Sequence, residues 1–358
     1  MKKSISFVLS GSADRPVGGF KIVYEYANRF ARKGWTVRII HPFTLWPTKQ
    51  PWVKKIRPLT RYLKSLILKT YLPTSWFKID SRVRMLWVPS LNEFFIPRSE
   101  FIVAGPVQSA YFVNSYSISR GKKFYFIQHF EDWEMPKDDV VRTWKFPLRK
   151  IVIAKWLGEI AQGLGEESVY IPNGLDFSFF KTLKPFESRP LKSIVFMTHA
   201  HGFKGTSYAL DALRILKKRY PELIVRTFSL YPKAENFPKF IEYFLDPSQD
   251  KLRELYNDSA IFLSPSLAEG WPLPPAEAMM CGCVVVATDI GGHREYIEDD
   301  INGLYCKPRS ADSIVETIEK VFCNPNLARK ISQAAPASLQ RFDWDSRVEL
   351  FEKALLSE

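Results

Sequence analysis

Short apolar runs recur along most of the chain, and this recurrence limits the possible folds more than any other feature. In the first half the runs are ISFVLSG, WTVRIIHP, RMLWVPS, EFIVAGP and KFYFIQH. In the second half they are KSIVFMT, LIVRTFS, AIFLSPS and CVVVATD, with helical stretches such as SYALDALRILKKRY between them. Strands that alternate with helices build parallel sheets covered by helices. The sequence therefore predicts an α/β protein with a doubly wound, Rossmann-like sheet in each half.

The length of the chain fits two such domains. Its 358 residues, 46% of them hydrophobic, suit two cores of about 170 to 180 residues each. The segment KTLKPFESRPLKS between the halves is polar and interrupted by proline, as interdomain linkers are. We expect a first domain over residues 1–176, a linker over 177–192, a second domain over 193–338 and a terminal helix over 339–358.

The N-terminus and the cysteines indicate a cytoplasmic protein. The run SISFVLSGS is too short for a signal peptide and reads as the first strand. No stretch reaches the roughly 18 to 20 apolar residues that span a bilayer. The cysteines lack the spacing of a metal site, so we expect reduced thiols. They are Cys281, Cys283, Cys306 and Cys323.

The stretch AEGWPLPPAEAM holds Glu269 and Glu277 with three prolines between them. Pro274 and Pro275 exclude a helix upstream and suit the first positions of a helix. We therefore expect a helix that begins near Pro274 and stops at Gly282, between the strands AIFLSPS and CVVVAT.

This unit would place both carboxylates where an α/β sheet binds ligands. Glu269 would follow the carboxyl end of a strand, and Glu277 would lie in the first turns of the helix. The N-terminus of that helix offers free N–H groups to a phosphate. The carboxylates are better suited to accept hydrogen bonds from the hydroxyls of a ribose or a sugar. Two solvated surface carboxylates are the alternative interpretation.

Residues 252–297 resemble the donor-binding half of the retaining glycosyltransferases of family 4, whose signature is two glutamates separated by seven residues. IAKWLGEIA and VYIPNGLDFSFF precede this segment in the order that the family has, although Val284 stands where a proline is common. The resemblance covers roughly residues 5 to 350. It implies the GT-B fold, in which two Rossmann-like domains face a cleft and the terminal helix returns to the first domain. It also implies an acceptor-binding first domain and a donor-binding second domain.

The resemblance also implies which residues form the site. Lys204, in FKG, stands where the family places a lysine that reaches the donor's diphosphate, and a flexible cation suits that role. His199 occupies the place of a partner arginine, and His129 that of a histidine that contacts the donor sugar. A solvated loop lysine and a structural histidine are the alternatives. The expected catalytic residues are His129, Lys204 and Glu269. The expected donor-binding residues are Gly18, Gly19, His199, Lys204, Glu269, Gly270, Trp271, Leu273, Pro274 and Glu277.

Two glycines in PVGGF follow the first strand. Gly18 and Gly19 would let the backbone approach a phosphate at the start of a helix. Their spacing differs from Gly-x-Gly-x-x-Gly, which disfavours a dinucleotide site. A simple tight turn is the alternative.

We expect no metal ion and no cofactor. The motif DWD opens the terminal helix, where Asp343 would cap it. His41, His201 and His293 lack the spacing of a zinc site. Lys204 and a helix N-terminus would instead stabilise the departing nucleoside diphosphate, and the resemblance implies retention of the anomeric configuration.

Two other classes of protein stay open. A nucleotide-sugar epimerase of the same fold would also need a diphosphate site. The net charge of +13 raises the possibility of nucleic-acid binding, but no recognition module is visible and we expect no nucleic-acid partner.

The segment WVKKIRPLTRYLKSLILK, residues 52–69, is a basic amphipathic stretch interrupted by Pro58. At about 100° per residue, apolar side chains gather on one face and basic ones opposite. The apolar set is Trp52, Ile56, Leu59, Leu63, Leu66 and Ile67. The basic set is Lys54, Arg57, Arg61 and Lys64.

Such a helix suits an anionic membrane surface. We therefore expect a peripheral enzyme at the inner face of the cell membrane. It would transfer sugar to a glycan or lipid-linked acceptor in the synthesis of a cell-surface polysaccharide. The alternatives are a helix packed on the first sheet and a basic face that steers a soluble acidic polysaccharide.

Overall fold

The chain separates into two compact units. The computed structural model of the protein describes residues 3–12, 14–45 and 53–357, with only the backbone for 53–59. The first unit comprises Met1–Asn173 and Asp345–Glu358, and the second comprises Gly174–Trp344. The expected division was at residue 176.

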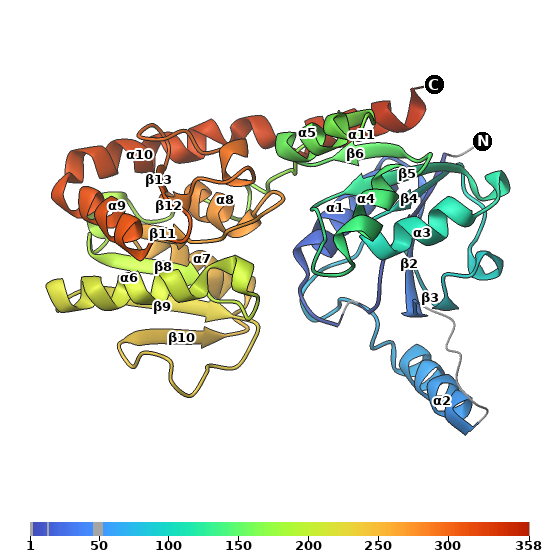
Figure 1. The fold of residues 1–358 in the computed structure, drawn as a ribbon, viewed down its shortest axis with the longest axis horizontal. Coiled ribbons are helices and arrows are strands. Elements are labelled where there is room, and N and C mark those ends of the chain that lie inside the picture. The colour runs from blue at the N-terminus through green and yellow to red at the C-terminus, as the bar shows by residue number, and fades with distance from the viewer. Residues whose placement is uncertain (1–2, 13, 46–52, 358) are drawn as a thin grey trace. The chain divides into compact units, whose positions relative to one another are not determined.

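The first unit is a parallel sheet of seven strands in the order β3-β2-β1-β4-β5-β6-β7 (Figure 1). Its strands are β1 (Ser4–Val8), β2 (Thr36–Thr44), β3 (Arg84–Ser90), β4 (Phe101–Ala104), β5 (Lys122–Ile127), β6 (Arg149–Val152) and β7 (Ser168–Tyr170). Its helices are α1 (Gly18–Arg32), α2 (Val53–Leu68), α3 (Val107–Ser115), α4 (Lys137–Trp144), α5 (Lys155–Gly163) and α11 (Trp344–Leu356), with short 3-10 turns η1 (Glu93–Phe95) and η2 (Ile118–Arg120).

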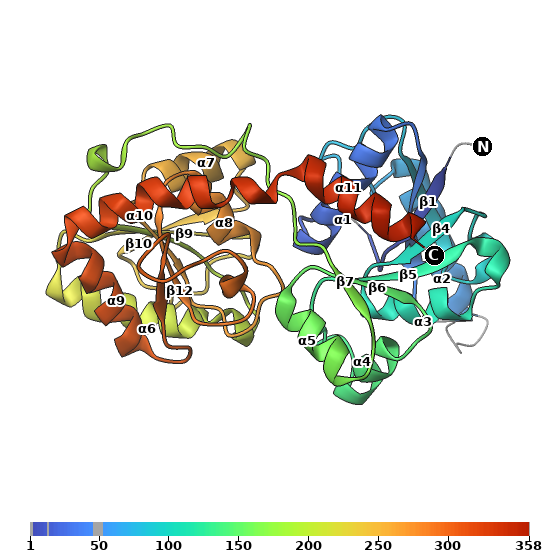
Figure 2. The same ribbon diagram turned by 90° about the horizontal axis from the view of Figure 1, so that it is seen from above.

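The terminal helix α11 packs on the sheet of the first unit, as predicted (Figure 2). The Phe351 ring lies 4.6 Å from that of Tyr26 on α1 and 5.3 Å from that of Phe126 on β5. At the rim, Glu352 accepts hydrogen bonds from Lys3 at 3.0 Å and from Lys33 at 2.5 Å. A helix that the second unit separates from the sheet in the sequence therefore completes its core.

The second unit is a parallel sheet of six strands in the order β10-β9-β8-β11-β12-β13. Its strands are β8 (Ser193–Met197), β9 (Ile224–Ser229), β10 (Ile241–Leu245), β11 (Ile261–Ser264), β12 (Val284–Thr288) and β13 (Leu304–Cys306). Its helices are α6 (Thr206–Arg219), α7 (Gln249–Asn257), α8 (Leu273–Met280), α9 (Ala311–Cys323) and α10 (Pro325–Ser338), with 3-10 turns η3 (Phe186–Ser188), η4 (Gly202–Lys204), η5 (His293–Glu295) and η6 (Gln340–Phe342).

The central strands β11 and β12 of the second sheet are buried on both faces. Phe196, Leu263 and Val286 come from three adjacent strands, and all are fully buried. Leu213 on α6 and Ile318 on α9 belong to the same apolar cluster. Parallel sheets need helices on both faces, because nearly all of their side chains are apolar. The prediction of two Rossmann-like domains is confirmed.

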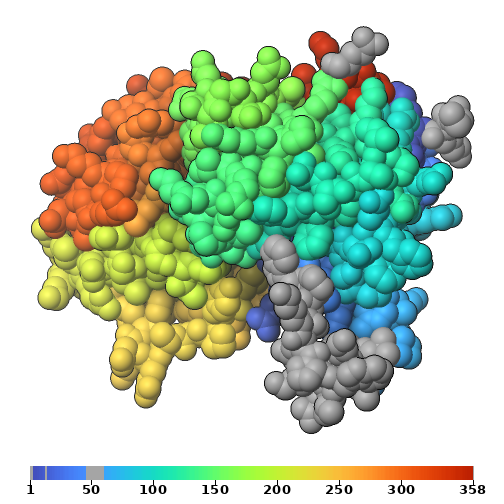
Figure 3. All heavy atoms as spheres, turned by 45° about the vertical axis from the view of Figure 1, so that its right-hand side comes forward, coloured from blue at the N-terminus to red at the C-terminus, as the bar shows by residue number. Residues whose placement is uncertain are grey.

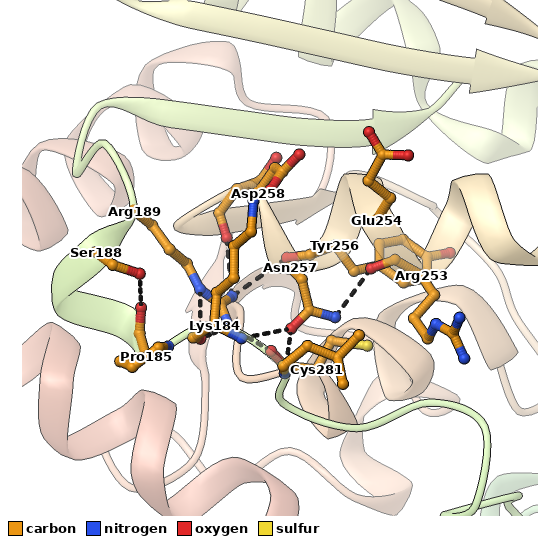
Figure 4. A network of polar contacts seen from close by, with 12 residues as sticks. Lys184, Pro185, Ser188, Arg189, Arg253, Glu254, Tyr256, Asn257, Asp258 and Cys281 are labelled. Carbon is orange, nitrogen blue, oxygen red and sulfur yellow. Dashed lines mark hydrogen bonds and ion pairs between the residues drawn. The ribbon is translucent and has the colours of Figure 1, made fainter.

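Residues 177–192, the expected linker, belong to the second unit (Figure 4). The buried Arg189 guanidinium donates to the carbonyls of Tyr256, Ser259 and Cys281 at 3.2, 3.1 and 2.6 Å. Asn257 Oδ1 accepts from the Leu183 amide at 2.6 Å. These polar contacts fasten the segment to the second unit, so it is not a free tether.

The amphipathic segment forms α2, whose bounds include Pro58. Trp52 lies outside the described residues, as do the side chains of Lys54, Ile56, Arg57 and Leu59. In the remaining part, Tyr62 packs inward, and its hydroxyl donates to the Trp87 carbonyl at 3.0 Å. Leu63, Leu66 and Ile67 are exposed. Among the described helices, none combines the length and the apolar character needed to cross a bilayer.

Candidate functional site

Lys204 and Glu269 form an ion pair at the carboxyl edge of the second sheet. Lys204 ends η4, beyond β8, and Glu269 lies in the loop after β11. These two strands are parallel neighbours, so their ends meet at one edge. Lys204 Nζ lies 2.8 Å from Oε1 and 2.9 Å from Oε2 of Glu269. The structure thus brings together two residues that lie far apart in the sequence.

Glu269 is a buried carboxylate that stays ionised. Burial alone would raise its pKa, but the Lys204 ammonium and the hydrogen bonds from Lys204 and Ser266 hold the pKa below the usual range. Ser266 Oγ donates to Oε1 at 2.7 Å. The site therefore contains a fixed negative charge and a fixed positive charge side by side.

His293 lies behind the pair and was not expected to belong to the site. It is fully buried; Nδ1 lies 2.7 Å from the Thr288 carbonyl and Nε2 lies 2.8 Å from Ser264 Oγ. Since a carbonyl only accepts, Nδ1 carries the proton. Burial lowers the pKa of His293 even though Glu269 opposes the effect. A neutral imidazole therefore connects the ends of β11 and β12, and the loop that carries Glu269 follows β11.

Two glycines permit the close packing of the loops around the pair. Gly205 has φ +67°, and a Cβ there would lie 1.9 Å from the Pro265 carbonyl oxygen. A Cβ on Gly292 would lie 2.5 Å from the Glu269 carbonyl oxygen. Only glycine allows such approaches. The Gly-Gly pair in DIGGHREY was the available sequence signal for the second position.

The helix α8 begins at Leu273, close to the predicted start at Pro274. The Trp271 ring is buried 4.7 Å from that of Tyr296, whose hydroxyl donates to the Pro272 carbonyl at 2.8 Å. Gly270 is buried too, whereas Leu273 and Pro274 are half-buried. Glu277 lies in the helix, with only 6% of its surface exposed. The start of α8 is therefore firmly packed.

His199 lies in a row of stacked rings beside Lys204. Its ring stacks on that of His201 at 4.8 Å, and His201 stacks on Phe203 at 5.3 Å. Burial, with smaller effects from Lys204 and His201, lowers the pKa of His199 to about 4. His199 is therefore neutral at pH 7 and adds no fixed positive charge.

Gly18, Gly19 and His129 belong to the first unit, whereas Lys204, Glu269 and Glu277 belong to the second. Gln128 Nε2 donates to the Gly19 carbonyl at 3.1 Å, which brings the glycine turn close to the end of β5. His129 packs edge-on against Trp133 at 4.5 Å and Trp156 at 5.5 Å. Sequence reasoning missed Gln128 and the two tryptophans, since neither contact follows from spacing.

A pair of acidic side chains lies near His129. Glu131 Oε2 accepts from the Val107 amide at the start of α3 at 2.5 Å, and Glu134 accepts from Gln108 Nε2 at 2.6 Å. Burial raises the pKa of Glu131 to about 7, with a smaller contribution from Glu134 and an opposing one from the Val107 N–H. Glu131 therefore titrates near neutral pH.

Metal ligands do not cluster in the part of the chain that the structure describes: no group of three or more His, Cys, Asp or Glu residues could hold an ion there. Metal independence stays a prediction.

Curated relatives of the chain are glycosyltransferases. An uncharacterized glycosyltransferase of Haemophilus influenzae is 28% identical over 150 residues, which are 39% of this chain and 42% of that protein. The serotype-specific mannosyltransferase WbdA of Escherichia coli is 26% identical over 284 residues, 75% of this chain and 31% of WbdA. The chain thus spans less than half the length of either relative.

Among solved structures, Anabaena Alr3699/HepE in complex with UDP and glucose has the same fold. Its TM-score is 0.73 at 15% identity, and the match covers 99% of each chain. The GT-B prediction of the fold is thereby confirmed. The segment that holds the Lys204–Glu269 pair, residues 183–338, matches the family described as Glycosyl transferases group 1.

Proposed function

We propose that the protein is a glycosyltransferase that moves a sugar from a nucleoside diphosphate sugar to an acceptor hydroxyl. The Lys204–Glu269 pair carries this proposal, because it sets one cation and one carboxylate at the ligand-binding edge of a parallel sheet. The match of residues 183–338 to group 1 glycosyl transferases supports it. So does the complex of HepE with UDP and glucose.

The pair divides the recognition of the donor between its two members. The Lys204 ammonium meets the negative charge that builds on the departing diphosphate, where a fixed cation lowers the barrier most. The ionised Glu269 accepts hydrogen bonds from hydroxyls of the sugar. The free N–H groups at the start of α8 add to the positive potential, and Glu277 on the same helix would hold the ribose.

Several finer features belong to this proposal. The chain would be a member of family 4 that retains the anomeric configuration and needs no metal ion. His129, Gly18 and Gly19 would complete the donor site from the first domain. Its acceptor would be a glycan or a lipid-linked saccharide of a cell-surface polysaccharide, reached from the cytoplasmic side of the membrane. The relation to WbdA, a mannosyltransferase, supports a hexose donor.

A thermal-shift screen with UDP, GDP and ADP tests the proposal. We expect one of these nucleotides to raise the melting temperature of the wild type. Lys204→Ala should lose that shift, because it removes the ammonium from the diphosphate site. Lys78→Ala, an exposed lysine of the first unit, is the matched control and should keep it. An equal shift in wild type and Lys204→Ala would contradict the proposed site.

A further inference from the structure

An apolar patch lies exposed at one edge of the first unit, next to the edge strand β3. Phe94 on η1 has 82% of its surface exposed, and Ile67 and Leu68 at the end of α2 have 77% and 58%. Phe95 and Leu63 are exposed as well. Large apolar side chains that gather in this way mark an interaction surface. We call these five residues the β3-edge patch.

A groove of about 490 Å³ runs between the α2 side and the η1 side of this patch. Leu66 of α2 lines it together with Leu86 and Trp87 of β3 and with Phe94, Phe95 and Ile96. In Figure 3 the light-blue atoms of α2 lie below the cyan atoms of the segment that contains β3 and η1. Trp87 stacks on Tyr71 at 5.2 Å. The groove therefore has aromatic rings and aliphatic side chains in its walls, together with Arg120, which pairs with Glu93.

The wall of the groove contains the indole of Trp87, whose N–H group is buried. Trp87 is 8% exposed, and its indole N–H finds no hydrogen-bond acceptor among the described residues. A buried N–H group without an acceptor is unfavourable, so this indole favours a ligand that contains a hydrogen-bond acceptor. An amphipathic ligand with an ester or phosphate oxygen has such an acceptor beside an apolar chain.

The surroundings of the patch are positively charged. Between Glu25 and Asp80 the sequence has no acidic residue. Arg61, Lys64 and Lys69 are exposed near the patch, and Arg84 and Arg98 flank the residues that line the groove. Within the described ranges, none of these five cations forms an ion pair with a carboxylate. Their charge is therefore available to an anionic partner.

We infer that the β3-edge patch is a docking surface for an anionic lipid bilayer. Phe94, Ile67 and Leu68 enter the interfacial region, the groove receives an acyl chain of a phospholipid, and the five cations meet the headgroups. The inference rests on the proposed function, because docking at this patch would bring the enzyme to its membrane-bound acceptor. A second copy of this chain is a poorer occupant, because two patches of the same charge repel each other.

A dye at the patch tests the inference in the full chain. Cys323 is the exposed cysteine of the described chain, and the other three are buried, so Cys323→Ser gives a background for labelling. Phe94→Cys then carries an environment-sensitive dye, and Ile301→Cys, at an exposed apolar site of the second unit, is the matched control. With phosphatidylglycerol vesicles we expect a blue shift and stronger emission at position 94 only. No change at 94, or an equal change at 301, would overturn the inference.

Vesicle flotation separates the apolar from the electrostatic contribution. Replacing Arg61 and Lys64 by Gln should lower partitioning onto phosphatidylglycerol about thirtyfold, and serine at Phe94, Ile67 and Leu68 should abolish it. Ile301→Ser should float like wild type. If the serine variant still floats, or if it instead dissociates a dimer, the inference fails.

The UDP, GDP and ADP thermal shifts measured on the same variants keep the two proposals apart. Flotation without any nucleotide shift contradicts only the proposed function. A nucleotide shift without flotation contradicts only the docking surface.

Discussion

The Lys204 ammonium bridges both carboxylate oxygens of Glu269, at 2.8 and 2.9 Å, at the carboxyl edge of the second sheet. The Lys204 ammonium keeps the Glu269 carboxylate ionised in a site where a lone buried charge would be costly. The side chain of Glu269 is 10% exposed and that of Lys204 19%. A nucleotide-sugar donor bound here would place its phosphate against Lys204 and its sugar hydroxyls against Glu269. These contacts would replace part of the Lys204–Glu269 ion pair.

The neutral His199 leads to a prediction about donor affinity. His199→Arg adds a fixed positive charge beside Lys204, so we expect the nucleotide selected in the thermal-shift screen to bind about tenfold more tightly at low salt. The gain should shrink at high salt, because ions screen a partly exposed charge. Calorimetric titration at two salt concentrations measures it.

His199→Gln is the matched control for this substitution. It stays neutral, so its affinity for the same nucleotide should equal that of the wild type at pH 7.5. An affinity of His199→Arg no higher than that of His199→Gln would mean that the diphosphate binds elsewhere.

The lowered pKa of Glu269 makes stability depend on pH. Because the folded state holds this carboxyl ionised, the pair stabilises the second unit above the unfolded value of about 4.5 and loses that effect as the pH falls further. The melting temperature of the wild type should therefore fall more steeply below pH 4.5 than that of Glu269→Gln. Parallel curves for the two proteins would contradict the ion pair.

Gly205 should be essential for the loop that carries Lys204. Gly205→Ala forces a Cβ against the Pro265 carbonyl in a left-handed conformation, so we expect a loss of more than about 1 kcal/mol in the free energy of unfolding. Gly202→Ala is the matched control, because a Cβ there meets nothing within 4 Å. It should change stability by less than about 0.5 kcal/mol. Urea denaturation of both variants makes the comparison, and equal losses would show that the loop is built differently.

The raised pKa of Glu131 predicts the opposite dependence of stability on pH in the first unit. Its pKa is raised to about 7, so the folded state favours the protonated carboxyl. The stabilisation is present below the unfolded value of about 4.5 and is lost as the pH rises through about 7. Glu131→Gln should therefore be less sensitive than wild type to pH between 5 and 8, in a melting curve that resolves the first unit. The exposed Asp132→Asn is the control and should behave like wild type.

Most of the fold could be predicted from the apolar runs. Runs such as AIFLSPS and CVVVATD became β11 and β12, because a strand buried on both faces needs a continuous apolar sequence. Four strands were not predicted: β6, β7, β10 and β13. β6 lies in a short apolar run, but the other three lack that signal. β7 and β13 contain three residues each, too few for a period to be visible. β10 reads IEYFL and lies at the edge of its sheet, where exposure weakens the pattern.

The sequence predicted which residues form the candidate site, but not most of the contacts between them. The resemblance placed Lys204 and Glu269 in one site, but their direct pairing depends on β8 and β11 being neighbours, which spacing alone does not reveal. The support from Ser266 and His293 depends on the same strand order. The neutrality of His199 follows from burial, which a sequence does not report.

The rate of sugar transfer by pair variants tests the central claim most directly. Wild type, Lys204→Met and Glu269→Gln are incubated with radiolabelled UDP-, GDP- and ADP-sugars and a membrane extract that supplies acceptors. We predict that the wild type transfers label from one of these donors. Both variants, with melting curves that show an intact fold, should be at least about 100-fold slower. Transfer by either folded variant at the wild-type rate would contradict the assignment of the donor site to this pair.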